Sequence, residues 1–157
     1  MASSRSCLTV AAACLWAATT LTTSACTAPV PTARSGADYD RKAAHTAEEV
    51  RSAVETARVA LRADGDGRVF SRTLDVLVTE AEGDAGGAAK TFLAIDPKGP
   101  HADDTRHELA SLLGDATATL ADVRIAVRRG DAEELHSATT VLAKIADALE
   151  AFIEDVG

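Results

Sequence analysis

The chain has 157 residues, of which 46% are hydrophobic and 25% charged, and its net charge is −8 at pH 7. Removing residues 1–25 takes away Arg5 and no acid, which leaves 15 basic residues against 24 acidic ones. This acidic excess argues against nucleic-acid binding, because phosphate contacts need clustered lysine and arginine. The negative charge also repels anionic lipid headgroups, so attachment to a bilayer would need a covalent anchor such as a lipid.

Residues 1–25 have the order of an export signal. Arg5 gives a basic start, 7-CLTVAAACLWAATTL-21 carries no charge, and small residues follow at Thr23, Ser24 and Ala25. This order is typical of a secretory signal peptide. The uncharged run is shorter than the roughly 20 residues of a membrane-spanning helix. We therefore expect cleavage after Ala25 rather than a retained span.

Cysteine usage singles out Cys26. A mature chain that begins there has lost Cys7 and Cys14, so it cannot form an intramolecular disulfide. The stretch 23-TSAC-26 resembles the lipobox of bacterial lipoproteins, although Thr23 stands where that box usually has leucine. The resemblance, which extends to the small lipoproteins of actinomycetes, implies fatty acylation of the Cys26 thiol. It also implies a place on the outer face of the cytoplasmic membrane, with secretion of a soluble protein as the alternative.

Residues 26–38 are expected to form a flexible tether. The segment 27-TAPVPTARSGAD-38 is rich in Pro, Thr, Ser and Ala and has almost no large apolar side chain. Such a segment buries too little surface to fold, and its prolines favour an extended chain. It could hold a domain up to about 35 Å from an anchor at Cys26.

Residues 39–157 predict an all-α domain. Apolar residues recur at spacings of three and four, and no stretch shows the alternation of a strand. Helices are expected at about 39–62, 68–95, 102–129 and 131–156, and their similar lengths and short connections predict an up-down-up-down antiparallel four-helix bundle. The expected core positions are Tyr39, Ala43, Ala47, Val50, Val54, Ala57 and Leu61, then Phe70, Leu74, Leu77, Ala81, Ala85, Ala88, Phe92 and Ile95, then Leu109, Leu112, Ala116, Leu120, Val123 and Val127, and finally Leu135, Ala138, Leu142, Ile145, Leu149, Phe152 and Val156.

The turns between helices carry local signals. Gly130 can take a left-handed closing position, and Asp131 with Glu134 forms a capping-box-like pair for the last helix. Pro97 and Pro100 end the second helix. Within that helix, 83-GDAGGAA-89 holds three glycines that each cost about 1 kcal/mol relative to alanine. Because the apolar phase persists across them, we expect one continuous, bent helix.

Two stretches resemble metal motifs and are not expected to bind metal. The loop 63-ADGDGRVFSRTLD-75 begins like an EF-hand, but Arg68 and Val69 occupy positions where that motif needs an oxygen ligand and a glycine. The pair 133-EELH-136 and 104-DTRH-107 loosely matches the Glu-x-x-His motifs of dinuclear bundles. In antiparallel neighbours these lie about 25 Å apart along the helix axis, which one cluster cannot span.

No cofactor is expected. His45, His101 and His107 could approach one end of the bundle, so surface capture of zinc or copper is conceivable there, although a solvated cluster is the favoured interpretation. Cys-x-x-Cys-His is absent and Met1 is the single methionine, which argues against haem. Serine-nucleophile motifs and phosphate loops are also absent.

The sequence therefore predicts a non-enzymatic envelope lipoprotein. Its expected partners are the lipid bilayer, through acylated Cys26, and another envelope protein contacted by the helical domain. The alternative is a four-helix bundle that carries or senses a small apolar ligand or a metal ion, because an alanine-rich seam and a glycine-weakened second helix leave room for one.

Overall fold

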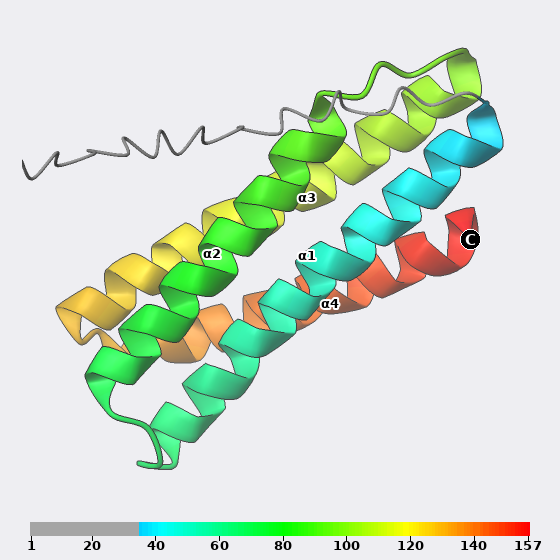
Figure 1. The fold of residues 1–157 in the computed structure, drawn as a ribbon. Coiled ribbons are helices and arrows are strands. Elements are labelled where there is room, and N and C mark those ends of the chain that lie inside the picture. Colours follow the sequence, from blue (N-terminus) through cyan, green and yellow to red (C-terminus); the bar gives the residue numbers. More distant parts are fainter. Residues whose placement is uncertain (1–34) are drawn as a thin grey trace, which may run out of the picture.

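The computed structural model describes residues 35–157, which fold into four α-helices (Figure 1). These are α1 (Gly36–Gly65), α2 (Ser71–Leu93), α3 (Pro100–Arg129) and α4 (Ala132–Val156). No strand occurs in this part of the chain, and the predicted all-α four-helix bundle is confirmed. None of these four helices is long and apolar enough to cross a membrane.

Successive helices run antiparallel, so the bundle has two distinct ends (Figure 1). We call the end that holds the start of α1, the α2–α3 loop and the C-terminus the near end. The far end holds the α1–α2 loop and the α3–α4 turn. Each helix packs against its neighbours around the bundle, and α1 also contacts α3 across it, whereas α2 and α4 do not touch in the described chain. The cross-section is therefore a rhombus with α1 and α3 on its short diagonal.

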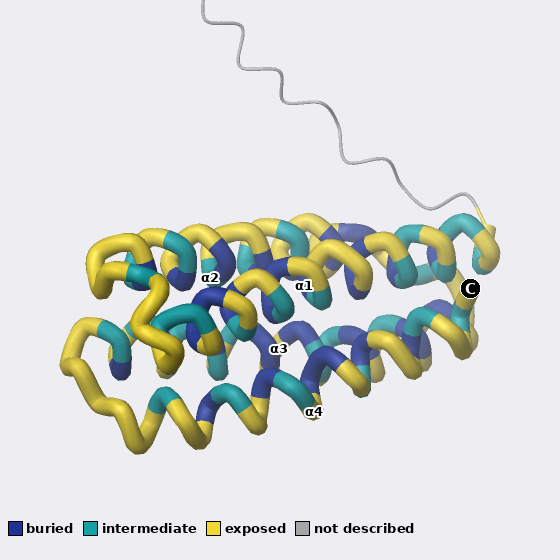
Figure 2. Tube along the Cα trace, turned by 90° about the horizontal axis from the view of Figure 1, so that it is seen from below, coloured by how far each residue is buried: buried dark blue, intermediate teal, exposed yellow. Residues whose placement is uncertain are grey.

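The core explains this short diagonal. Every helix turns a buried stripe inward (Figure 2), and on α1 much of this stripe is alanine, including Ala43, Ala47 and Ala57. Alanine side chains end at Cβ, so α3 can approach α1 closely. The largest fully buried aliphatic side chains lie on α3 and α4, namely Leu109, Leu113, Leu120, Leu142 and Leu149.

Side chains from three helices fasten the near end. The rings of Tyr39 and Phe92, both almost completely buried, lie with their centroids 5.3 Å apart at an interplanar angle of 54°. Arg106 of α3 donates hydrogen bonds of 2.6 Å to the carbonyl oxygens of Leu93 and Ile95. Leu93 is the last residue of α2, whose final carbonyls have no partner within the helix, so the Arg106 cation satisfies one of them and interacts favourably with the negative end of the helix dipole. Its second bond holds the carbonyl of Ile95 in the loop that follows.

The helix boundaries differ from the predicted ones where a cap decides them. α1 begins at Gly36, inside the tether expected at 26–38, because the Ser35 side chain accepts a hydrogen bond of 3.2 Å from the Asp38 backbone N–H. α3 begins at Pro100, two residues before the expected start, and proline suits the first turn because its missing N–H is not needed there. The α3–α4 turn agrees with its prediction: Gly130 has φ 67°, and Asp131 accepts a hydrogen bond of 3.0 Å from the Glu134 N–H.

Phe70 was expected in the core and is 87% exposed. It precedes Ser71 as the N-cap residue of α2, so it stands outside the helical phase that the spacing assumed. The predicted positions Leu77, Ala88 and Leu112 are only half-buried, and the residue after each is fully or nearly fully buried instead. A helix with neighbours on two sides buries a wider sector than one heptad stripe. The buried replacements are Val78, Ala89 and Leu113, and the other half-buried positions are Val127, Leu135 and Val156.

α2 is continuous through Gly83, Gly86 and Gly87, as the sequence predicted. A Cβ atom built on any of these three glycines would meet no atom within 4 Å outside the local helix backbone. Close packing inside the described bundle therefore does not require glycine at these positions.

Candidate binding surfaces

The predicted lipidation site, Cys26, lies outside the described residues, as do the expected signal peptide and most of the expected tether. The first described residue, Ser35, stands at the near end beside the start of α1. Any anchor at Cys26 would therefore join the bundle at its near end.

The predicted histidine candidates do not form a metal centre. Nε2 of His101 lies 3.1 Å from a carboxylate oxygen of Asp40, and Nδ1 of His45 lies 3.5 Å from Glu49. Both imidazoles are mostly exposed, and His107 is exposed on α3. Nowhere in residues 35–157 do three histidine, cysteine or acidic side chains gather as a metal ion would require.

The acids of the far-end loop are engaged by arginines. Asp66 forms an ion pair with Arg68, two residues on, and Asp75 pairs with Arg128 of α3 at 2.9 Å. Asp64 belongs to the last turn of α1. Of the two carboxylates that open the EF-hand-like stretch, Asp66 is thus paired with an arginine and Asp64 belongs to α1, and the stretch forms a helix-to-helix turn.

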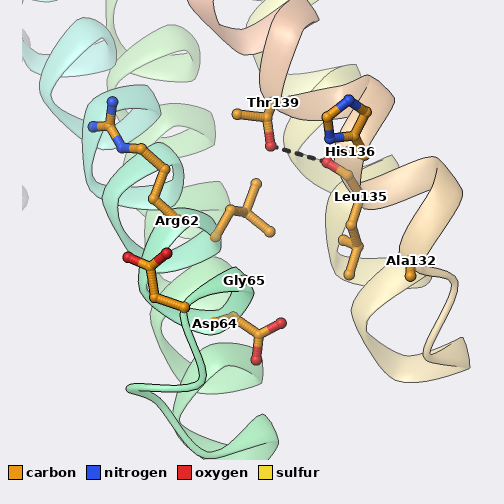
Figure 3. A pocket seen from close by; sticks show the side chains of 9 residues that line it. Arg62, Asp64, Gly65, Ala132, Leu135, His136 and Thr139 are labelled. Atoms are coloured by element: carbon orange, nitrogen blue, oxygen red, sulfur yellow. Dashed lines mark hydrogen bonds between the residues drawn. The ribbon is translucent and has the colours of Figure 1, made fainter.

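A cleft separates α1 from α4 at the far end (Figure 3). Its volume is about 580 Å³, and the small residues Gly65 and Ala132 leave its mouth open. Asp64 lies on the α1 wall and His136 on the α4 wall, with the cleft between them. His136 is thus far from the near-end histidines, as its place in the predicted 133–136 motif implied. The cleft is lined by one arginine, Arg62, and by two acids, Asp64 and Asp66. These side chains do not converge on one point where a ligand could bind.

A second hollow lies between α1 and α2 toward the far end, and it is apolar. Its volume is about 370 Å³. Val59 is 56% exposed on its rim, and Phe70 follows directly after the lining residue Val69. We call Val59, Val69, Phe70 and Leu77 the far-end apolar patch. The hollow is lined by Thr56, Val59, Ala60 and Ala63 of α1, by Val69 of the loop and by Leu77 of α2.

A third hollow continues along the same pair of helices toward the near end. Its volume is about 530 Å³. Its lining residue Ser52 is one helical turn from Thr56 of the apolar hollow, so the two hollows follow each other on α1. Together they form what we call the α1–α2 groove, which runs from Thr46 to Ala63 over about 26 Å. The second part is lined by Thr46, Glu49 and Ser52 of α1 and by Asp84, Ala88 and Thr91 of α2.

The α1–α2 groove is acidic at its near-end half. Glu49 and Asp84 line it, and no lysine or arginine does. Asp84 has no ion pair with any described residue, whereas acids on the opposite side of α2 are neutralised: Glu82 pairs with Arg124 and raises the pKa of that guanidinium through their hydrogen bond. The unneutralised charge of α2 thus faces the groove.

One titratable group lies in the core. Burial raises the pKa of Tyr39, and the guanidinium of Arg106 acts against this rise. The hydroxyl of Tyr39 makes no hydrogen bond of ordinary geometry with a described residue. Its ring packs on Phe92, so we assign Tyr39 to the core and not to a site.

Comparison with known proteins gives no relative: no protein-family model, no curated protein and no solved structure matches the chain. The sequence analysis did not identify the groove, because its lining depends on which flanks of α1 and α2 meet. One signal pointed toward it: Val59, which lines the groove and is exposed, lies off the predicted core stripe.

Proposed function

We propose that this protein is a lipid-anchored envelope lipoprotein whose four-helix bundle binds another envelope protein and performs no catalysis. The observation that supports this most directly is the far-end apolar patch. Val59 and Phe70 of this patch are exposed, and the half-buried Val69 and Leu77 line the same apolar hollow as Val59. A continuous apolar surface on a folded domain marks an interaction site more often than scattered apolar side chains do. Phe70, at 87% exposure, is the most exposed large apolar residue of the described chain.

The position of the patch fits a tethered protein. Acylation of Cys26, for example with palmitate, would hold the chain at the bilayer about ten residues before α1. The 30 residues of α1 span about 45 Å and Val59 is 23 residues after Gly36, so the patch lies about 35–45 Å from the end where the anchor joins. The acidic domain is repelled by anionic headgroups. Both features favour presentation of the patch to a partner in the envelope rather than to the lipid surface.

The alternative is a carrier of a small ligand or metal, and the α1–α4 cleft of about 580 Å³ is the observation that favours it. We rank it second because the cleft is open to solvent and its lining includes the charged side chains of Arg62, Asp64 and Asp66, whereas small-molecule sites are mostly enclosed and apolar. Native mass spectrometry of protein purified from its own host separates the two. A stoichiometric small-molecule adduct supports the carrier, and a bare mass supports the interaction protein.

The anchor is tested by replacing Cys26. Cys26→Ala should block acylation, alter processing of the leader and move the protein from the membrane fraction to the soluble fraction. Mass analysis of the native protein should show a fatty-acylated N-terminal cysteine. An unchanged mass and an unchanged membrane fraction in the variant would contradict the anchor.

A further inference from the structure

We propose that the α1–α2 groove binds a helix of the partner protein, with large apolar side chains at one end of that helix and lysine or arginine at the other. This inference rests on the proposed role of the bundle as an interaction module, and it does not depend on the anchor at Cys26. Helix-in-groove binding is a common form of recognition, in which apolar side chains of an amphipathic helix enter a hydrophobic groove.

The dimensions of the groove suit a helix. Its length of about 26 Å corresponds to about 17 helical residues. Most lining side chains are small, such as Ser52, Thr56, Ala60 and Ala88, so the two walls leave a hollow along the seam between α1 and α2. A helix laid into this seam would bury side chains that the bundle itself leaves half-exposed.

The two halves of the groove require different chemistry. The far-end half is bounded by Val59, Val69 and Leu77, and its few polar atoms favour apolar side chains. The near-end half presents the carboxylates of Glu49 and Asp84, with Glu80 one turn before Asp84 on α2. No lysine or arginine lines either half, so a cationic side chain would find acids that lack a strong partner. This polarity also fixes the direction in which the bound helix lies.

The same polarity disfavours a second copy as the occupant. Two grooves paired about an axis parallel to the helices would place Glu49 and Asp84 of one copy against the same carboxylates of the other. Two grooves paired antiparallel would place these acids against the apolar half. Neither arrangement neutralises the acids, and uncompensated charge in an interface is costly.

A substitution at Gly87 tests whether a partner helix comes close to the backbone of α2. It lies one turn before Thr91 of the groove lining, and a Cβ atom at Gly87 would meet nothing within 4 Å. Inside the bundle, alanine should therefore be tolerated there. Gly86 is a matched control, because it lies one turn after Glu82, which pairs with Arg124 on the α3 side of α2. A partner helix in the groove would contact Gly87 and not Gly86.

The experiment selects ligands and then maps them. A displayed library of random 18-residue peptides is panned against the purified full-length protein, and enriched peptides are measured by fluorescence anisotropy. We expect enriched sequences with apolar residues at helical spacing in one half and several lysines or arginines in the other. Asp84→Lys and Gly87→Ala should each weaken binding at least tenfold, Phe70→Ser should weaken it severalfold, and Gly86→Ala should leave it within twofold.

Other outcomes overturn the inference. Enriched peptides without a basic half, no enrichment, or equal affinity for Gly87→Ala and the unaltered protein would each exclude a basic helix in the groove. A concentration-dependent dimer in sedimentation equilibrium that Gly87→Ala disrupts would assign the groove to a second copy. Tighter peptide binding after proteolytic removal of residues 1–34 would assign it to the chain's own N-terminal part. The Cys26 experiment is read from membrane fractions and mass, so its failure is distinguishable from each of these results.

Discussion

The near end and the far end of the bundle are fastened by different kinds of contact. At the near end, α1, α2 and α3 are joined by the Tyr39–Phe92 ring pair and by the hydrogen bonds of Arg106. At the far end, the α1–α2 loop is held mainly by its own backbone, with Arg68 N–H donating to Ala63 at 2.8 Å. Side chains of three helices therefore meet where the N-terminal segment joins, while the apolar surface available for binding lies at the other end.

The largest predicted contrast is between two phenylalanines. Phe92→Ala removes a buried ring and should lower the free energy of unfolding by about 3–5 kcal/mol. Phe70→Ser alters an exposed side chain and should change it by less than about 0.5 kcal/mol. Urea denaturation of both variants provides the measurement. A loss of more than about 2 kcal/mol from Phe70→Ser would show that the far end is packed in solution and would remove the contrast.

A smaller effect is expected at Arg106. Arg106→Ala leaves the carbonyls of Leu93 and Ile95 without these donors, and hydrogen bonds from a charged group contribute about 1.5–3 kcal/mol. We expect a loss in that range, measured as the free energy of unfolding. Arg106→Lys keeps the charge but cannot place two donors in the same fork, so it should recover only part of the loss. If Arg106→Lys had the same free energy of unfolding as the unaltered protein, the positive charge alone would account for the contribution of Arg106.

The glycines of α2 should be replaceable at a gain. Gly86→Ala and Gly87→Ala remove backbone freedom of the unfolded chain in a helix with space for a Cβ, and each should stabilise the protein by up to about 1 kcal/mol. Gly130→Ala is the opposing control, because φ of 67° strains any other residue and a loss is expected. Thermal denaturation measures all three, and destabilisation by Gly87→Ala would reveal a structural need for glycine in the bundle itself.

The smallest effect concerns Tyr39. Its buried hydroxyl makes no hydrogen bond of ordinary geometry with a residue of the described chain, so Tyr39→Phe should change stability at pH 7 by less than about 1 kcal/mol. Because burial raises the pKa of Tyr39, its contribution is complete below the unfolded value near 10 and is lost as pH rises through the folded value. The phenylalanine variant lacks this loss. Urea denaturation at pH 8 and pH 10.5 should therefore show a smaller decline for the variant, and equal declines would contradict the assignment.

The fold could be predicted from sequence because its signals are local. The left-handed Gly130 and the cap of α4 by Asp131 are decided by neighbouring residues, and both are as expected, although the Asp131 N–H donates to Ala126 rather than to the Glu134 side chain. Continuity of α2 through its glycines followed from the apolar phase on both sides. Phe70 shows where this reasoning failed, because spacing alone does not reveal whether a residue is already inside the helix.

The candidate groove could not be predicted because it is a tertiary feature. Thr56 and Ser52 are ordinary exposed positions of an amphipathic helix until α2 places Leu77 and Asp84 beside them. The partners of the histidines are tertiary features in the same way: His101 lies beside Asp40, a residue 61 positions earlier, whereas His45 lies beside Glu49 on its own helix. The pairing of acids with cations depends on how far each helix is shifted along its neighbour. The amino-acid composition does not specify this shift.

The contact of α1 with α3 across the diagonal has a consequence for how the molecule opens. α1 and α3 each touch all three other helices, whereas α2 and α4 never touch each other in the described chain. Either outer helix can therefore detach while the other stays docked on the α1–α3 pair. Amide hydrogens at the centres of α1 and α3 should exchange with solvent only on complete unfolding, and those of α2 and α4 through smaller, separate openings. Tension applied through the N-terminal segment would then load one of the two slowly exchanging helices first.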